Sequence, residues 1–259
     1  MQRPSRLSSW LLALALVSIA GPALARGGAG TCRPITGLPA SITEAGAFCL
    51  IGDLSTPAPQ GIAIRIMAED VVLDLNGFTL AGHPPDRRTT TMLGIVATGG
   101  RNITVRNGTV RGFFDGISMV ATGVIVENIR ADDNTHRGIF VGGPGNIVRN
   151  NQVLATGGTT VGAGIPEVVR ASAISVVGAA PRVLNNDVTG LANENTSPPT
   201  GIFLINVTGA LVVGNRIAFV DTGIEFSTAA VVSEGKYRDN LTVAVGTPYV
   251  GGTDAGNNQ

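Results

Sequence analysis

The chain has 259 residues, no formal net charge and only 14% charged side chains, while 44% of its residues are hydrophobic. Without a basic excess, the composition gives no reason to expect a nucleic-acid partner. The 36 glycines and the 4% share of aromatic residues suit a protein built from many short turns. We therefore expect one large domain with numerous turns and a lightly charged surface.

Residues 1–25 have the features of a signal peptide. Two arginines within the first six residues precede an apolar run at 10–19, and an Ala-Leu-Ala sequence at 23–25 follows. The run is too short to cross a bilayer, which takes about 20 residues. The alternative is an N-terminal anchor helix, which the Gly-Pro pair at 21–22 would interrupt. We expect export to the periplasm or beyond, with no membrane span after signal removal.

The two cysteines of the chain, Cys32 and Cys49, lie close together after the signal segment. An even cysteine count in an exported protein favours one disulfide, and two free buried thiols are the alternative. We expect the bridge to stabilise an N-terminal cap over residues 26–58. Such a cap would cover the open edge of whatever repeat structure follows.

A Gly-Ile dipeptide recurs along the chain at intervals of 22 residues, as at Gly94, Gly116 and Gly138 and again at Gly201 and Gly223. A fixed period of this length is typical of a solenoid. Aligned on this dipeptide, seven segments keep an apolar residue at the Ile position and two residues later, with a variable residue between. This period of two predicts short strands. The expected segments start at Gly61, Gly94, Gly116, Gly138, Ala173, Gly201 and Gly223.

A second short β segment follows in each repeat and ends at an asparagine. Asparagine tolerates left-handed backbone angles at a corner, and stacked side-chain amides can bond to one another along an axis. The expected asparagines are Asn76, Asn107, Asn128, Asn150, Asn185 or Asn186, and Asn215.

These patterns predict an all-β protein whose residues 59–246 form a single-stranded parallel β-helix of about seven to eight coils. Longer intervals place inserts at 83–88, 156–170 and 191–200, and inserts in a solenoid protrude as loops, often on the binding face. Residues 247–259 are rich in Gly and Asn, and we expect them to be a flexible tail.

Residues 71–80, 102–113 and 115–117 resemble the bacterial exported right-handed parallel β-helix repeat proteins, a group similar in fold to pectate lyases and polysaccharide epimerases. The likeness covers roughly residues 41–243. It implies a right-handed coil and an extracellular polysaccharide as the partner.

The motifs of the active relatives are missing. Of the polygalacturonase motifs only the Asp-Asp pair at 132–133 has a counterpart, and there is no Gly-His-Gly and no Asp-Pro-His-Asp. No zinc spacing or phosphate loop is present. We expect no cofactor and no metal site; calcium is compatible with the resemblance but nothing in the sequence indicates it.

Stacking of the repeats brings one set of reactive residues together. Asp115 precedes Gly116, and Arg137 precedes Gly138, so the two would lie side by side on adjacent coils with His136 beside them. An Asp or His could abstract a proton and an Arg could hold a sugar carboxylate with two hydrogen bonds. The alternative is an ordinary corner ion pair that only orders the coil.

The outward position between the two apolar columns supplies the candidate substrate-binding residues Phe140, Phe203 and Glu225. The rings could stack on sugars, or a loop could cover them. The other outward residues of this column are Ala63, Val96, Ser118 and Ser175. On the second strand, Arg106, Glu127 and Arg149 should form a solvated charge ladder.

Two functions follow from these observations. The first is a secreted solenoid that binds an extracellular polysaccharide and, if it is an enzyme, cleaves or epimerises it as a lyase, hydrolase or epimerase. This rests on analogy of fold. The second is a non-enzymatic structural or adhesive surface protein, which the missing motifs and low charge favour.

Overall fold

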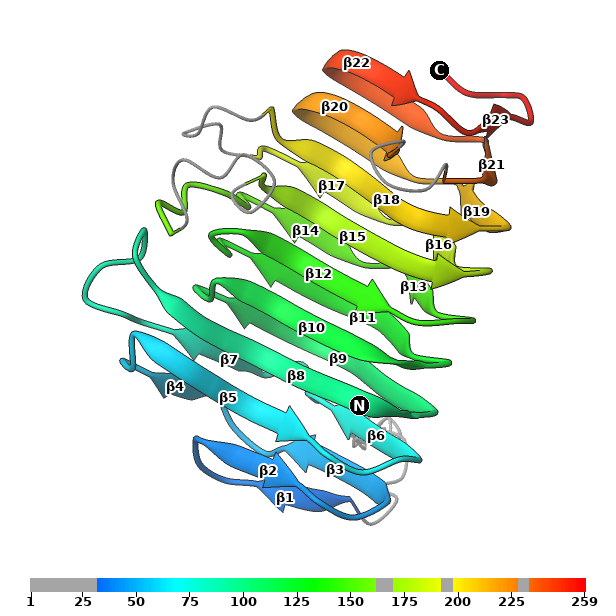
Figure 1. Cartoon of the computed structure of the whole chain (residues 1–259). Helices are drawn as coiled ribbons and strands as arrows, with labels where there is room; N and C mark the ends of the chain where they lie inside the picture. The colour runs from blue at the N-terminus through cyan, green and yellow to red at the C-terminus, as the bar shows by residue number, and fades with distance from the viewer. Residues whose placement is uncertain (1–31, 162–169, 192–197, 228–232) are drawn as a thin grey trace, which may run out of the picture. The chain divides into compact units, whose positions relative to one another are not determined.

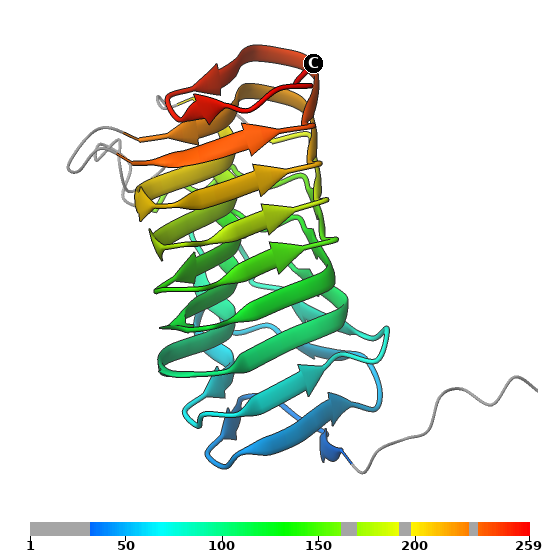
Figure 2. The same cartoon turned by 90° about the vertical axis from the view of Figure 1, so that its right-hand side faces the viewer.

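The computed structural model describes residues 32–161, 170–191, 198–227 and 233–259, and these form 23 strands without a helix. All strand pairs are parallel. The chain winds as a right-handed parallel β-helix, which confirms the predicted fold class (Figures 1 and 2). No helix in the described part of the chain is long and apolar enough to cross a membrane.

Each coil contributes strands to up to three sheets. Four long strands bend through a corner, so that each pairs within two of these sheets. They are β9 (Ile103–Arg111), β11 (Ile125–Asp132), β20 (Arg216–Phe226) and β22 (Leu241–Val250). The first sheet stacks β2 (Ala40–Ile42), β5 (Gln60–Ile66), β8 (Thr91–Arg101), β10 (Asp115–Thr122), β12 (Arg137–Gly142), β15 (Ser172–Ala179), β18 (Thr200–Thr208) and the ends of β20 and β22.

The second sheet stacks β1 (Arg33–Ile35), β3 (Gly46–Leu50), β6 (Val71–Asp74), the starts of β9 and β11, β13 (Ile147–Arg149), β16 (Arg182–Leu184), β19 (Ala210–Val213), β21 (Gly235–Arg238) and β23 (Thr253–Asp254). The third stacks β4 (Leu54–Thr56), β7 (Thr79–Gly82), the ends of β9 and β11, β14 (Gln152–Leu154), β17 (Asp187–Thr189) and the starts of β20 and β22.

The interior is a set of aliphatic columns. Equivalent residues pair in register from coil to coil, and every isoleucine of the repeat column is at most 1% exposed. Each buried aliphatic side chain stabilises the fold by roughly 1.5–3 kcal/mol. The column consists of Ile64, Ile95, Ile117, Ile139, Ile174, Ile202 and Ile224.

The first predicted segment is two residues out of register. The structure pairs Ile64, rather than Ile62, with Ile95, so Arg65 faces outward opposite Val96 and Ala63 is fully buried. The placement of Ala63 in the outward column was therefore wrong. Ile62, Ile64 and Ile66 alternate along β5, so the sequence pattern is compatible with either register, and the structure places Ala63 level with Gly94.

The glycine of the repeat is required by close packing between coils. A Cβ on Gly116 would lie 2.7 Å from the carbonyl oxygen of Gly138, and one on Gly94 would lie 2.2 Å from that of Gly116. The same column holds alanine at 63 and 173, and both side chains are fully buried. The Gly-Ile dipeptide thus combines a backbone contact with an interior side chain.

The asparagines form two neighbouring columns rather than one. The first, which includes Asn107, Asn128 and Asn150, has left-handed backbone angles with φ between 54° and 59°. The second is buried except for its last member, which is half-buried, and each side-chain amide donates to the next along the column. This second column consists of Asn151, Asn186, Asn215, Asn240 and Asn258.

Both ends of the described chain take part in the coil stack. Cys32 and Cys49 form a disulfide with their Cα atoms 5.7 Å apart, and the surrounding residues already form β1 to β3. At the other end, where we expected a flexible tail from residue 247, β22 and β23 pair with β20 and β21. Tyr249 stacks on Tyr237 with 4.8 Å between the ring centroids, so the last coil covers the end of the core.

Candidate functional site

Asp115, His136 and Arg137 lie together where adjacent coils enter the first sheet. Asp115 Oδ1 is 2.9 Å from His136 Nδ1, and Arg137 donates from Nε to Oδ1 (3.1 Å) and from Nη2 to Oδ2 (2.6 Å). Asp115 and Arg137 are direct partners in the β10–β12 pairing. The repeat spacing therefore predicted this neighbourhood correctly.

The Asp115 carboxyl group remains ionised in this environment. Burial alone would raise its pKa, but the hydrogen bond with His136 and the charge of Arg137 outweigh that effect, and the pKa lies below its ordinary value. A carboxylate only accepts hydrogen bonds, so Nδ1 of His136 must carry the proton. Asp115 thus orients the imidazole and cannot serve as a general acid near neutral pH.

Two aromatic rings flank this cluster. Phe114 stacks on the His136 ring with 4.6 Å between centroids, and the guanidinium of Arg137 lies 4.1 Å from the centroid of Phe140. The Arg137 side chain is 24% exposed and that of His136 is 10% exposed. Nε and Nη2 of Arg137 bind Asp115, so the expected two-bond grip on a sugar carboxylate would have to use the remaining N–H groups of Nη1 and Nη2, from a guanidinium whose charge is already paired.

A second cluster repeats the arrangement two coils further along. Arg170 donates from Nη1 to Glu225 Oε1 at 3.1 Å and from Nη2 to Glu225 Oε2, and its guanidinium lies 4.5 Å from the centroid of Phe203. Arg170 Nη2 also donates to Thr200 Oγ1 at 2.6 Å. Each cluster is therefore a guanidinium on a phenyl ring, neutralised by one carboxylate.

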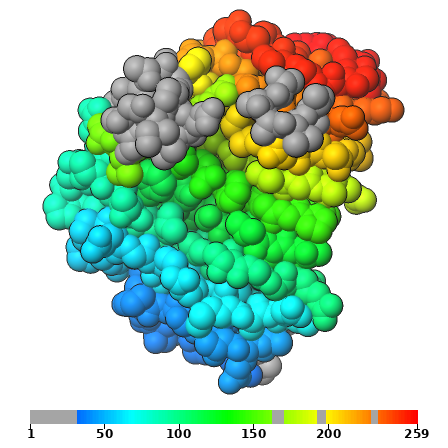
Figure 3. Space-filling model, viewed as in Figure 1, coloured from blue at the N-terminus to red at the C-terminus, as the bar shows by residue number. Residues whose placement is uncertain are grey.

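Register aligns the two clusters on the outer face of the first sheet. Phe140 pairs with Ser175, Ser175 with Phe203, and Phe203 with Glu225. We call the residues Arg137, Phe140, Ser175, Phe203, Arg170 and Glu225 the Arg/Phe strip. It follows the helix axis across β12, β15, β18 and β20, on the sheet that faces the viewer in Figure 1 and, as a surface, in Figure 3.

Sequence reasoning named every member of the strip except Arg170. This residue is the last of the insert at 156–170, which interrupts the 22-residue spacing, and residues 162–169 lie outside the described residues. One signal could have identified Arg170. It lies two residues before Ser172, and Ser172 pairs with Arg137, so Arg170 enters the first sheet near the same edge as the first cluster. Two residues of the predicted outward column are buried, because Val96 is 4% exposed and Ser175, which lies between the two rings of the strip, is 2% exposed.

The remaining polar features of the described chain have simpler explanations. Arg149 Nη2 pairs with Glu127 at 2.6 Å, whereas Arg106 Nε pairs with Asp74 at 2.9 Å, so the charge ladder of the second sheet is satisfied by surface ion pairs. Among the described residues, no group of three or more His, Cys, Asp or Glu side chains could hold a metal ion.

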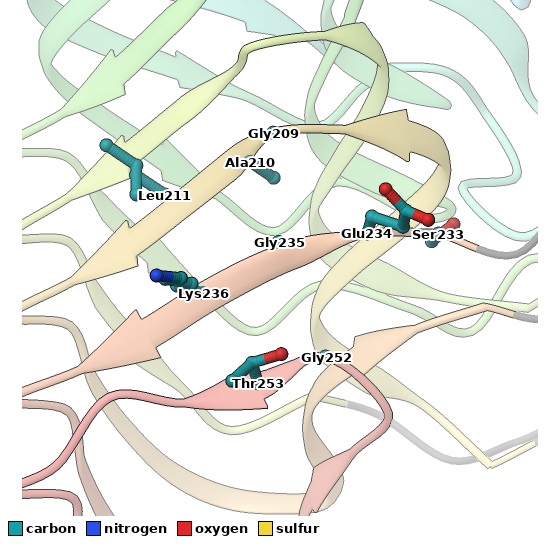
Figure 4. A pocket seen from close by; sticks show the side chains of 9 residues that line it. All are labelled: Gly209, Ala210, Leu211, Ser233, Glu234, Gly235, Lys236, Gly252 and Thr253. Atoms are coloured by element: carbon teal, nitrogen blue, oxygen red, sulfur yellow. The ribbon is translucent and has the colours of Figure 1, made fainter.

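A hollow in the described surface lies away from the strip. It has a volume of about 690 Å³ and lies along β19, β21 and β23 of the second sheet (Figure 4). Glycine, alanine and small polar residues make up most of its lining, and Glu234 and Lys236 are the charged residues there. This lining has no aromatic ring and no pair of reactive groups, so it offers less chemistry than the strip.

Comparison with known proteins supports the fold. No protein-family model matches the chain, and no curated protein matches it. Among solved structures, the Dettilon tailspike protein is similar, with a TM-score of 0.55 and 14% identity over 85% of this chain and 53% of the tailspike. The two share the parallel β-helix fold. This chain thus spans about half the length of the tailspike.

The catalytic domain of Agl-KA is matched more weakly. Its TM-score is 0.32, with 15% identity over 83% of this chain and 62% of that domain. At 14% identity the tailspike indicates the fold alone and the match to Agl-KA carries no argument, so a function must be argued from the residues of the strip.

Proposed function

We propose that the chain is an exported protein that binds a polysaccharide along the Arg/Phe strip. The observation that carries the proposal is the repetition of one cluster, a guanidinium on a phenyl ring beside a carboxylate, at two places along the axis. A repeated binding feature suits a repeated ligand. The disulfide between Cys32 and Cys49 supports export, because such bonds persist in oxidising compartments.

The spacing of the two clusters suits an extended glycan. Phe140 and Phe203 are two coils apart in the register, which corresponds to about 10 Å at about 4.8 Å for each coil. One disaccharide of an extended chain spans such a distance. Apolar faces of sugar rings would contact the phenyl rings, while the ion-paired guanidinium and carboxylate groups would bond to hydroxyl groups.

The net charge of the strip indicates which part of the polymer it would recognise. Arg137 is paired with Asp115, and Arg170 with Glu225, so each positive charge has a negative partner. The strip therefore suits the uncharged ring and hydroxyl groups of a glycan, and any acidic substituent would need a different contact.

Binding assays with substitutions on the strip test the proposal. We expect Phe140→Leu and Phe203→Leu each to weaken polysaccharide binding about tenfold, equal to about 1.4 kcal/mol, because leucine lacks a flat ring. Phe219→Leu is the matched control, since Phe219 is 64% exposed and lies outside the strip. Absence of binding to all neutral and uronic-acid polymers, or an equal loss in the control, would contradict the proposal.

A second candidate function, cleavage of the bound chain, is favoured by the Asp115–His136 pair. Asp115 fixes the proton on Nδ1, and Nε2 has no hydrogen bond to the described residues, so Nε2 could accept a proton from a substrate. His136→Asn should then abolish product formation while binding is kept. If the variant releases as much product as wild type, His136 is not the base, and if wild type releases no product from a bound polymer, the protein binds the polymer without cleaving it.

A further inference from the structure

A cationic hollow lies at the corner where the third sheet passes into the first. Two adjoining cavities of about 420 and 130 Å³ share Arg87 and Asp133 in their linings. Arg88 and Ala155 line the larger cavity, and His83, Pro84 and Arg111 line the smaller one. We call the two together the corner hollow.

Two inserts build the wall of this hollow. The backbone carbonyl of Arg88, from the first insert, accepts hydrogen bonds from Thr160 N at 2.8 Å and from the hydroxyl groups of Thr159 and Thr160. These contacts join segments that are 71 and 72 residues apart in sequence. The hollow is thus held by hydrogen bonds across several coils.

Among the described lining residues of the hollow, arginines outnumber carboxylates. Arg87 Nη1 is 2.6 Å from Asp133 Oδ1, and Arg111 Nη2 is 3.9 Å from Asp133 Oδ2, so two guanidinium groups share one carboxylate. The nearby Asp132 is paired with Arg130 at 3.5 Å. Asp86, which accepts from Arg88 N at 2.9 Å, is outside the lining. Arg87 and Arg111 remain 43% and 45% exposed, so a ligand can reach them.

The hollow adjoins the candidate site along the chain. Asp133 is three residues before His136 on the same turn, and Arg111 is four residues before Asp115. A polymer bound on the Arg/Phe strip could therefore extend into the corner. This matters because the ion pairs of the strip leave no net charge for an acidic group.

We propose that the corner hollow is an oxyanion subsite that binds a carboxylate, sulfate or phosphate substituent of the glycan. The guanidinium groups of Arg87 and Arg111 supply paired N–H donors, the geometry that suits such oxyanions. This rests on the proposed polysaccharide binding at the strip, and it adds that the preferred polymer is acidic.

Binding of matched glycans tests the subsite. Titrations would compare a neutral oligosaccharide with its uronate and sulfated counterparts, using wild type, Arg87→Gln, Arg111→Gln and the control Arg101→Gln. Arg101 pairs with Glu69 at 3.1 Å and is 69% exposed, so the control changes the net charge equally. Thermal unfolding would verify that all variants are folded.

The expected result is tighter binding of the acidic glycans by wild type, with this advantage reduced about tenfold in the two hollow variants and kept in Arg101→Gln. Equal binding of neutral and acidic glycans, or an equal loss in Arg101→Gln, would overturn the subsite and leave the strip standing. If no glycan binds, the strip fails, and inorganic sulfate and phosphate then test the hollow alone. Chemical-shift changes of the Arg87 and Arg111 side chains on addition of these anions would support the hollow if replacing either arginine with Gln reduces the change at the other, and no change in wild type would overturn it.

Discussion

Asp115 carries a buried negative charge, and two neighbouring side chains stabilise it. Its carboxylate is 3% exposed and bonds to both His136 and Arg137. Isolated buried charges are strongly unfavourable, so the three side chains act as a unit. The low pKa of Asp115 makes the contribution of this unit to stability dependent on pH.

We therefore expect the free energy of unfolding to fall in acid as Asp115 becomes protonated. Since its folded-state pKa is lowered, its contribution is complete above the unfolded pKa of about 3.9 and is lost as the pH falls through the lower folded pKa. Asp115→Asn should cost about 2 kcal/mol in urea unfolding at pH 7, with a smaller difference from wild type at pH 3. Asp239→Asn is the control for burial, because this carboxyl group also has a lowered pKa but is exposed, so its replacement should destabilise the fold less than that of Asp115. A difference independent of pH would contradict the account.

Replacing Asn186 tests the contribution of the buried asparagine column to stability. Its Nδ2 donates to Val148 O and to Asn215 Oδ1, and its Oδ1 accepts from Asn151. Asn186→Ala should lower the free energy of unfolding by about 3 kcal/mol, because several buried groups lose their partners. Denaturant unfolding would measure this loss.

The control for Asn186 is Asn150→Gly, an exposed position in the neighbouring column with φ of 56°. Glycine tolerates this angle, so the loss in the free energy of unfolding should be much smaller than that of Asn186→Ala. Similar losses in the two variants would show that the ladder has no special role.

At the scale of the repeat, the glycine before each isoleucine sets the distance between coils. Gly116→Ala would place a Cβ 2.7 Å from Gly138 O and 2.8 Å from Asn134 Nδ2, forcing the backbones apart. We expect a destabilisation of about 1–3 kcal/mol in thermal or urea unfolding. Gly52→Ala is the matched control, as a Cβ there meets no atom within 4 Å. Equal effects in the two would contradict the packing argument.

The repeat pattern predicted the strands and part of the site because stacking in register makes equivalent positions neighbours. The contact of Asp115 with Arg137 follows directly from this rule. Arg170 was not predicted, because the insert before it removes the fixed spacing and its contact with Glu225 spans 55 residues. The register of β5 was misassigned because a shift of two residues preserves the alternation.

The asparagine pattern was predicted in part for a related reason. Asn76 and Asn107 match the expected corner positions, and both have left-handed φ angles. Sequence spacing alone could not separate this column from the buried one, because Asn150 and Asn151, or Asn185 and Asn186, are adjacent in the chain. Burial distinguishes them, and burial depends on which side of the corner turn each residue occupies.

At the scale of the whole solenoid, each coil contacts mainly its neighbours, so a change at one end should remain local. Deleting residues 253–259 removes β23 and Asn258. Asn258 Oδ1 accepts hydrogen bonds from the backbone N and the side-chain Nδ2 of Asn240. We expect hydrogen exchange to accelerate around Asn240 and β22 and to stay unchanged in β10 and β12. Uniform acceleration through the molecule, or no change near Asn240, would contradict this locality.

The most direct test of the central claim, that the first sheet carries a polysaccharide-binding strip, is hydrogen–deuterium exchange with and without a bound polysaccharide. The account predicts slower exchange in β12, β15 and β18 and in the corner hollow, with β13, β16 and β19 of the second sheet unchanged. Protection confined to the second sheet, or no protection by a polymer that binds, would contradict it.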